Sequence, residues 1–289
     1  MDSLTISQST LRLTTSGSLT ITNDIILSSS TFTYKGINVE MKTLSVTSTP
    51  VTIEATGYMR INRDVTITSC NSFSYKGTDI TIGSLTTTGS KVSLISISNN
   101  NLLINGKVEI KETSELSFNG KDVTIDSLTI TTSTLSLQTS GLLTVPNDVN
   151  IHSGTFTFEG TTVSLGSMTS KSSSITFGKT TNITVNGKLT IETMNSFIMN
   201  GKSFNLGSLE MISSIITLST QTNIEVKNET IIQKNSQLPF LGTMAKFGSL
   251  KIKETSSVTF SSGCKTEIER EVKIENESIF TFDGTQRSI

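Results

Sequence analysis

A repeat of about 41 residues runs through the chain and limits the folds that are open to it. A motif of the form Phe-x-(Phe/Tyr)-x-Gly recurs, and the glycines that close it or its looser copies are 40 to 43 residues apart. These glycines are Gly36, Gly77, Gly120, Gly160, Gly201, Gly242 and Gly284. About six residues later comes a second motif, as in Gly83-Ser84-Leu85 and Gly166-Ser167-Met168. A period of this size is typical of solenoids and propellers.

Seven copies of about 41 residues suit a seven-bladed β-propeller, whose blades each hold four antiparallel strands. The turn-forming residues are spaced more closely than that, at about six to seven residues. Short alternations of apolar and polar residues lie between them, such as Val149-x-Ile151 and Phe156-x-Phe158. This spacing predicts about six short strands per repeat. It favours an all-β parallel β-solenoid (β-helix), and the propeller is the alternative.

In the solenoid, three sides of about 6.8 residues form a coil of about 20 residues, and two unlike coils form one repeat. The chain then has about 14 coils, and a coil of this length favours the right-handed form. Gly and Asn are expected at the corners, where they can adopt positive φ. Inward residues should align in columns, in which Phe32 lies two coils from Phe73 and Tyr34 two coils from Tyr75, with residues such as Val51 in the coils between. Pro239 lacks an N–H and predicts weak strand pairing at its position.

Composition narrows the classes of partner. The chain has 289 residues, of which 16% are charged, and its net charge is -1. A net charge this close to zero does not attract nucleic acid. The sequence also lacks a run of about 20 apolar residues, so we expect no direct insertion into a membrane. The repeats predict a single solenoid domain over residues 1–289. The start shows no signal-peptide pattern, and both ends fall inside a repeat, so we expect a segment of a longer protein.

The candidates for catalysis or metal binding have simpler explanations. His152 is the only histidine, and the equivalent positions of other repeats share no chemistry with it. Asp24, Asp64 and Asp148 occupy equivalent corners, but copies two coils apart are separated by about 10 Å, too far to share one calcium ion. We therefore predict corner roles for these residues. The sequence predicts no catalytic, cofactor-binding or metal-binding residue and no enzyme activity.

Three further features carry no functional prediction. Cys70 and Cys264 lie about nine to ten coils apart, so we expect no disulfide between them within one molecule. Asn182, Asn228 and Asn276 begin glycosylation sequons, but a chain so rich in Ser and Thr yields this many by chance.

A threonine-rich solenoid face also raises the hypothesis of ice binding, which needs a flat and regular grid of hydroxyl groups. The outward positions of one face in alternate coils are Thr5, Ser45, Thr86, Thr129, Thr169, Glu210 and Lys251. Two charged residues break this grid toward the C-terminus. The pattern therefore disfavours ice binding.

The repeat is similar to one found in known proteins, and the similarity is seen in runs such as residues 141–151, Gly-Leu-Leu-Thr-Val-Pro-Asn-Asp-Val-Asn-Ile. The repeat resembles the β-solenoid shafts of large surface adhesins, such as filamentous haemagglutinin-like and autotransporter passenger proteins. The resemblance covers nearly the whole chain, although its motifs are generic to stacked coils. It implies a rigid spacer or adhesive shaft, located outside the cell or on its surface.

Three functions stay open at this stage. The first is a non-enzymatic structural or adhesive shaft, with a cell-surface ligand as partner. The second is a self-assembling filament subunit that adds end to end through open coil edges. The third is a β-helix that binds or degrades polysaccharide.

Overall fold

The computed structural model describes residues 1–97, 100–178, 182–193, 196–218, 221–283 and 286–288. Within them the chain is an all-β parallel β-solenoid of about 13 turns, with about 21 residues per turn. The predicted fold class is therefore confirmed. The propeller alternative is wrong, because the described strand pairs are parallel while the strands of a blade are antiparallel.

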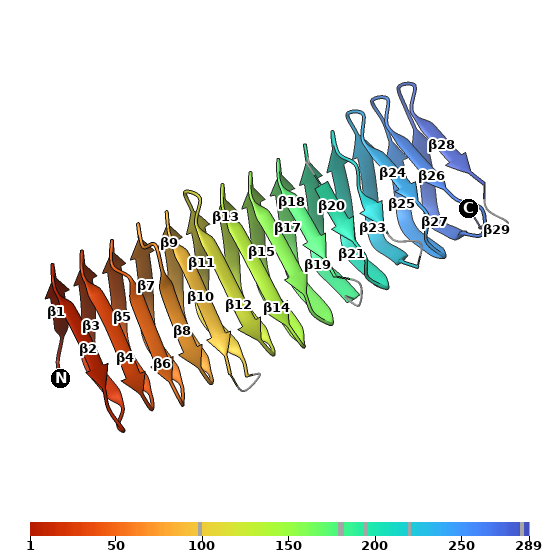
Figure 1. The fold of residues 1–289 in the computed structure, drawn as a ribbon. Coiled ribbons are helices and arrows are strands. Elements are labelled where there is room, and N and C mark those ends of the chain that lie inside the picture. The colour runs from red at the N-terminus through yellow and green to blue at the C-terminus, as the bar shows by residue number, and fades with distance from the viewer. Residues whose placement is uncertain (98–99, 179–181, 194–195, 219–220, 284–285, 289) are drawn as a thin grey trace. The chain divides into compact units, whose positions relative to one another are not determined.

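The coils divide into two compact units, Met1–Thr144 and Val145–Ile289. Each unit alternates long and short strands, and each kind pairs only with its own kind in the neighbouring coils (Figure 1). The long strands therefore lie in one sheet, and the short strands lie in separate sheets of their own. Whether the whole chain forms a single domain stays a prediction.

The strands of the first unit follow the coils in order. Its long strands, with the shorter β1 at the start, are β1 (Leu4–Ser7), β3 (Leu19–Ser28), β5 (Val39–Thr47), β7 (Met59–Thr68), β9 (Ile80–Thr88), β11 (Leu102–Lys111) and β13 (Val123–Thr131). Its short strands are β2 (Thr10–Thr14), β4 (Thr31–Gly36), β6 (Val51–Ala55), β8 (Phe73–Gly77), β10 (Lys91–Ser96), β12 (Glu115–Gly120) and β14 (Thr134–Thr139).

The second unit repeats the scheme. Its long strands, with the shorter β29 at the end, are β15 (Leu142–His152), β17 (Thr162–Lys171), β19 (Asn182–Glu192), β21 (Ser203–Ile212), β23 (Asn223–Gln233), β25 (Met244–Ile252), β27 (Lys265–Ile274) and β29 (Gln286–Ser288). Its short strands are β16 (Thr155–Glu159), β18 (Ser174–Phe177), β20 (Ser196–Met199), β22 (Thr217–Leu218), β24 (Gln237–Phe240), β26 (Ser257–Phe260) and β28 (Ile279–Phe282).

Each long strand combines two of the predicted sides of a coil. Its pairing shifts register near the middle, for example between Ile61 and Asp64 of β7 and between Val185 and Lys188 of β19. The inward residues on either side of the shift keep their alternation, so the strand bends without losing its place in the sheet. A 41-residue repeat therefore has four strands rather than the predicted six, because one corner of every coil lies inside a continuous strand.

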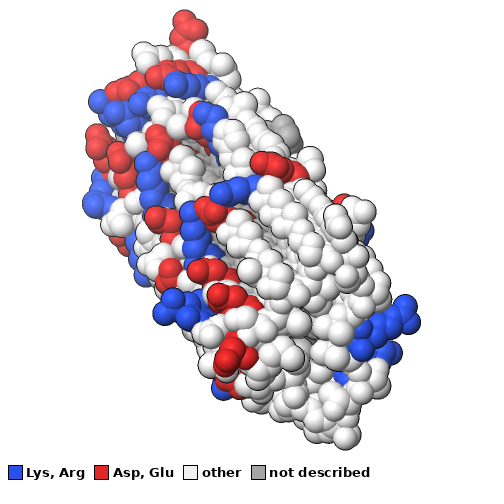
Figure 2. Space-filling view, turned by 90° about the vertical axis from the view of Figure 1, so that its left-hand side faces the viewer, with Lys and Arg blue, Asp and Glu red and all other residues white. Residues whose placement is uncertain are grey.

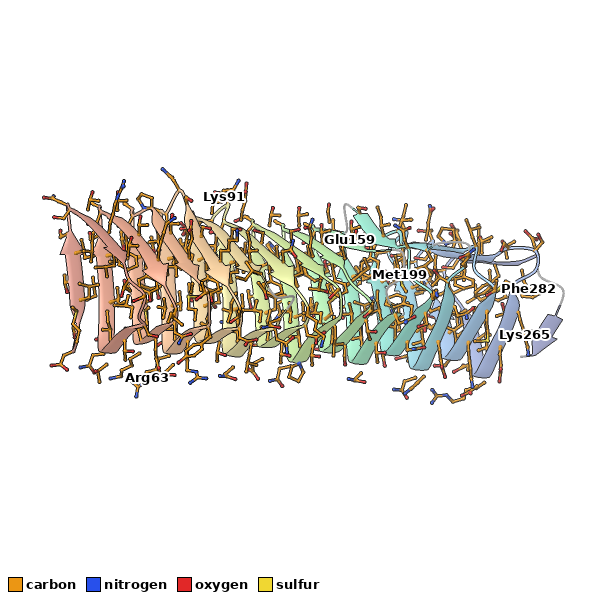
Figure 3. All side chains as sticks on the ribbon, turned by 60° about the horizontal axis from the view of Figure 1, so that its bottom comes forward. Arg63, Lys91, Glu159, Met199, Lys265 and Phe282 are labelled. Atoms are coloured by element: carbon orange, nitrogen blue, oxygen red, sulfur yellow. The ribbon has the colours of Figure 1, made fainter. Side chains whose placement is uncertain are left out.

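The core consists of the predicted columns of inward side chains. Phe32 pairs with Leu11 on one side and with Val51 on the other, and Val51 pairs with Phe73. Phe32, Val51 and Phe73 are at most 2% exposed. Figure 3 shows the same division of faces, with Met199 among the side chains inside the coils and outward-pointing polar side chains around them. Stacking buries apolar faces that no single coil could cover.

Pairing of the short strands weakens beside Pro239, as predicted. The described sheet of short strands ends at β22, and a separate three-stranded sheet begins at β24. An isolated bridge joins Ile215 to Gln237 at this break. Pro239 itself pairs with Thr259 of the next coil. A residue without an N–H can accept a ladder hydrogen bond but cannot donate one.

The corner after each long strand differs from the expectation. A residue with positive φ stands there in coil after coil, and it is most often Ser or Thr rather than Gly or Asn. Ser29, Ser48 and Ser69 have φ between 48° and 51°. Their backbone N–H groups donate to carbonyl oxygens of the next coil, at 2.9 to 3.0 Å. These inter-coil bonds hold the corner residues in a conformation that L-residues seldom adopt.

Candidate functional site

A column of buried hydroxyl groups lies at this same corner. The residue after each left-handed position is Ser30, Thr49, Cys70, Ser90, Ser114 and Ser133 in the first unit, and we call this column the hydroxyl ladder. The backbone N–H of Ser30 donates to Thr49 Oγ1 at 3.1 Å, and that of Ser90 donates to Ser114 Oγ at 3.1 Å. The second unit has the same bonds, as from Ser236 N to Ser256 Oγ. Sequence analysis missed the ladder, although a Ser or Thr recurs at this position.

Both cysteines are buried free thiols. Cys70 is a member of the ladder, where its N–H donates to Ser90 Oγ at 3.0 Å and its Sγ lies 2.9 Å from the carbonyl oxygen of Thr49. Burial raises the pKa of both the Cys70 and the Cys264 thiol above its ordinary value. A protonated and buried thiol is a weak nucleophile, so these residues fit packing roles.

The recurring aspartates tie one coil to the next at the bend of the long strand. Asp24 Oδ1 accepts a hydrogen bond from Thr43 Oγ1 at 2.7 Å, and Asp64 Oδ1 accepts one from Ser84 Oγ at 2.6 Å. Asp148 has the same relation to the hydroxyl group of the following coil. The serine of the Gly-Ser motif is thus a partner of the aspartate one coil earlier. These contacts account for the recurrence of both residues.

The other residues that the sequence singled out lie on the outside. His152 is the exposed last residue of β15. The sequon residues Asn182, Asn228 and Asn276 are exposed as well, and Asn182 Oδ1 accepts a hydrogen bond from Ser203 Oγ at 3.1 Å. The structure brings none of these four residues together with another into a described cluster.

The hydroxyl-rich face considered for ice binding is interrupted within the first unit. Ile26, which is 46% exposed, pairs with Thr5 and Ser45 in its outward column. Glu109 stands between Thr86 and Thr129 in the same column. Figure 2 shows a wide uncharged area whose side chains run in rows, beside a band of mixed charges. The rows are regular, but this column is not a continuous array of hydroxyl groups.

A groove forms along the corner that follows the short strands of the first unit. Its volume is about 500 Å³, and it spans five successive coils. Its lining consists of Thr14, Thr15, Ser16, Lys35, Gly36, Ile37, Glu54, Ala55, Thr56, Lys76 and Ile97, and we call it the corner groove. Most of the surface exposed in it is apolar.

The packing of Tyr34 accounts for the glycine in the floor of the corner groove. Its ring folds under Gly36, so that a Cβ atom on this glycine would lie 2.1 Å from the tyrosine hydroxyl oxygen. The hydroxyl lies 3.0 Å from the carbonyl oxygen of Gly17 and 2.9 Å from that of Asn38, either of which can accept its proton. The large inward ring therefore requires the smallest residue two positions later. The Phe-x-(Phe/Tyr)-x-Gly motif follows from this packing.

The two walls of the corner groove differ in character. Ile37 and Ile97 are 42% and 48% exposed and form the apolar side. The other side carries Lys35, Glu54 and Lys76, which are aligned in three successive coils. Lys35 Nζ lies 2.8 Å from Glu54 Oε2. The hydrogen bond from the Lys35 ammonium lowers the pKa of Glu54 below its ordinary value. The positive charge of Lys76 lowers the same pKa less strongly.

Two further hollows are open and polar. One, of about 230 Å³, lies on the outer face of the short strands, where Ser93, Ser117 and Ser136 are in register. The other, of about 460 Å³, lies where corners with two successive left-handed residues stack, between Lys234 and Glu277. Neither hollow gathers buried titratable side chains.

In the described part of the chain, no group of three or more His, Cys, Asp or Glu side chains could hold a metal ion. The described residues also include no helix that is long and apolar enough to cross a bilayer. Comparison with models of protein families, with curated proteins and with solved structures gives no match for this chain.

Proposed function

We propose that this chain is a non-enzymatic structural or adhesive shaft, located on a cell surface or on an appendage. The observation that carries the proposal is the continuity of contacts from coil to coil within each unit. Within the described residues, backbone hydrogen bonds join neighbouring coils through the long strands and, except at the break between β22 and β24, through the short strands. Load applied along such a stack is shared by many parallel hydrogen bonds, which suits a stiff spacer.

Side chains add to these backbone contacts at each of the three kinds of corner, in some of the coils. The hydroxyl ladder joins the coils after the long strands, and the Asp-to-hydroxyl bonds join them at the bend. Tyr34 and Tyr75 place their hydroxyl groups within hydrogen-bond distance of carbonyl oxygens at the third corner. Because all three corners are tied in this way, bending or sliding of the coils would break several hydrogen bonds at once.

Electron microscopy of the purified protein tests the proposal. Isolated elongated particles, which keep their strand content in far-ultraviolet circular dichroism at different protein concentrations, are the expected result. Hydrolysis of any member of a glycan panel would instead support a polysaccharide-degrading β-helix. Compact round particles would contradict the shaft.

A specific observation also favours a filament subunit. β1 and β2 each have a strand neighbour on one side only, and so does β28. The inward residues Leu11 and Phe280 are only partly buried, and Ile279 is 59% exposed. Where such an edge ends the stack, its partly exposed core residues can accept another coil of the same kind. Filaments whose length grows with protein concentration would favour this candidate over the isolated shaft.

A further inference from the structure

We propose that the corner groove of the first unit binds an extended peptide segment of a partner protein, one that alternates aliphatic and acidic residues. This goes beyond the shaft proposal, since a shaft could serve as a spacer without any ligand. The shape of the groove, its apolar lining and the order of its charges support this proposal.

The shape of the groove suits a linear ligand. Its lining extends from Thr14 in the first coil to Ile97 in the fifth. Four steps between coils at about 4.8 Å each give a length of about 19 Å, which an extended peptide of about six residues would cover. The floor has little side-chain volume, because Gly36 and Ala55 stand at its successive inward positions. A backbone can therefore approach the coils closely.

The lining favours a peptide over a glycan. Apolar atoms account for most of the exposed surface in the groove, and Ile37 and Ile97 supply its largest apolar side chains. A glycan presents many hydroxyl groups, and those that face the isoleucines would lose their water without gaining a partner. Aliphatic side chains of an extended peptide lie on every second residue and can rest against this wall without that cost.

The charges select an acidic ligand. Lys35, Glu54 and Lys76 give the wall two positive charges and one negative charge. Glu54 is paired with Lys35, whereas Lys76 has no ion-pair partner among the described residues. A carboxylate of the ligand would therefore find its partner at Lys76. The alternation of the peptide places acidic residues on this side when its aliphatic residues face the isoleucines.

The test is a binding titration of the full chain with a fluorescent peptide of about six residues that alternates valine and glutamate. The same peptide with lysine in place of glutamate, and polygalacturonate as an acidic glycan, are the comparison probes. We expect saturable binding of the glutamate peptide only, and weaker binding at high salt because the contact at Lys76 is exposed.

Two pairs of variants locate the binding. Lys76→Glu and Ile37→Ser should each weaken binding of the glutamate peptide at least tenfold. The matched controls are Lys42→Glu, which makes the same change of charge outside the groove, and Ile26→Ser, which removes an equally exposed isoleucine from another face. Each control should stay within about twofold of the unchanged protein, and circular dichroism of all four variants should show retained fold.

Three outcomes would overturn the proposal. The first is binding of the glutamate peptide that Lys76→Glu and Ile37→Ser leave unchanged. The second is equal binding of the lysine peptide. The third is binding of polygalacturonate without binding of the glutamate peptide, which would assign the groove to an acidic glycan. The shaft proposal survives each of these outcomes, because its own test measures particle shape and not binding.

Discussion

Single side chains in this protein act mainly on the coil before or after their own. Ser90 illustrates this, because its Oγ accepts from the N–H of Cys70 in the preceding coil and donates within its own corner to the carbonyl oxygen of Thr88, at 2.8 Å. Tyr34 similarly determines which residue can stand at position 36. A substitution at such a position is therefore felt in two coils.

Thr87 differs from these residues, and its replacement is predicted to stabilise the protein. Its side chain is fully buried, and its Oγ1 has no hydrogen-bond partner among the described residues. Thr87→Val keeps the shape and removes the unsatisfied hydroxyl, so we expect the free energy of unfolding to rise by about 1 kcal/mol. The control is Thr86→Val on the outward side of the same strand, which should change stability by less than about 0.5 kcal/mol. Denaturant unfolding measures both, and a loss of stability in Thr87→Val would refute the assignment.

The pairing of Tyr34 with Gly36 predicts a destabilising substitution and its rescue. Gly36→Ala places a Cβ against the tyrosine hydroxyl, so we expect a loss of about 2 kcal/mol in unfolding free energy. The next coil has Ile53 and Ala55 at the equivalent positions and tolerates the methyl group. Tyr34→Ile alone also costs stability, because it removes a fully buried ring. The double variant Tyr34→Ile with Gly36→Ala should therefore lose less stability than the sum of the two single variants. Additive losses in thermal and denaturant unfolding would contradict this coupling.

At the scale of the element, a glycine and a polar contact act together at the bend of long strands such as β9. Gly83 stands at the bend of β9, where a Cβ atom would lie 2.4 Å from the carbonyl oxygen of Arg63 in the preceding coil. The adjacent Ser84 donates to Asp64 across the same gap. The close approach and the hydrogen bond together fix how β9 lies on β7. A close-packed glycine and a serine hydrogen bond also occur together at the bend of β17, at Gly166 and Ser167.

Charged residues on β11 make one strand sensitive to acid. Glu109 forms ion pairs with Lys107 and Lys111, and hydrogen bonds from these two ammonium groups lower its pKa. A carboxyl group whose pKa is lowered on folding stabilises the folded state above its unfolded pKa of about 4.3, and this contribution is lost as the pH falls through the folded pKa.

Glu109→Gln should therefore lower the free energy of unfolding at pH 7 by less than about 1 kcal/mol, since the pairs are close to the surface. The difference from the unchanged protein should shrink as the pH falls below about 4. Glu112→Gln is the control, because Glu112 forms no ion pair among the described residues. Denaturant midpoints at several pH values give the measurement, and a difference that stays constant with pH would count against the assigned cause.

At the scale of the whole molecule, a coil is the unit that can be added or removed. Val39 pairs with Met59, and Met59 pairs with Ile80, so residues 39–79 form one complete two-coil repeat. Contacts in such a stack join neighbouring coils only, and stability is close to a sum over coils and their interfaces.

Deletion of residues 39–79 should therefore leave a folded protein, with the strand spectrum retained and a modest loss of stability. Deletion of residues 39–69, about one and a half coils, should abolish folding of the first unit, because long strands would meet short strands. Circular dichroism and hydrogen exchange distinguish the two outcomes. Folding of both variants to the same extent would show that register does not govern the stack.

Some features of the fold could be predicted from particular residues. Phe32, Tyr34 and Gly36 are close in sequence, and the alternation of apolar residues every second position fixes which face is inward. The number of strands could not be predicted, because a bend with continuous pairing and a corner that ends a strand have the same turn-forming residues. The hydroxyl ladder could not be predicted either, because Ser and Thr are common throughout this chain and a recurring one does not stand out.

The corner groove shows the same limit at the candidate site. Lys35, Ile37, Glu54 and Lys76 carry no recognisable motif, and they become neighbours only when the coils stack. The sequence alone favoured a parallel solenoid over a propeller, because turn-forming residues every six to seven residues predict strands shorter than those of a four-stranded blade. The tertiary structure alone decided which side chains meet at the corners and in the groove, because that depends on the length of each coil and on the path of each corner. Hydroxyl bonds across coils, the Tyr34–Gly36 contact and the charge order of the groove all follow from that register.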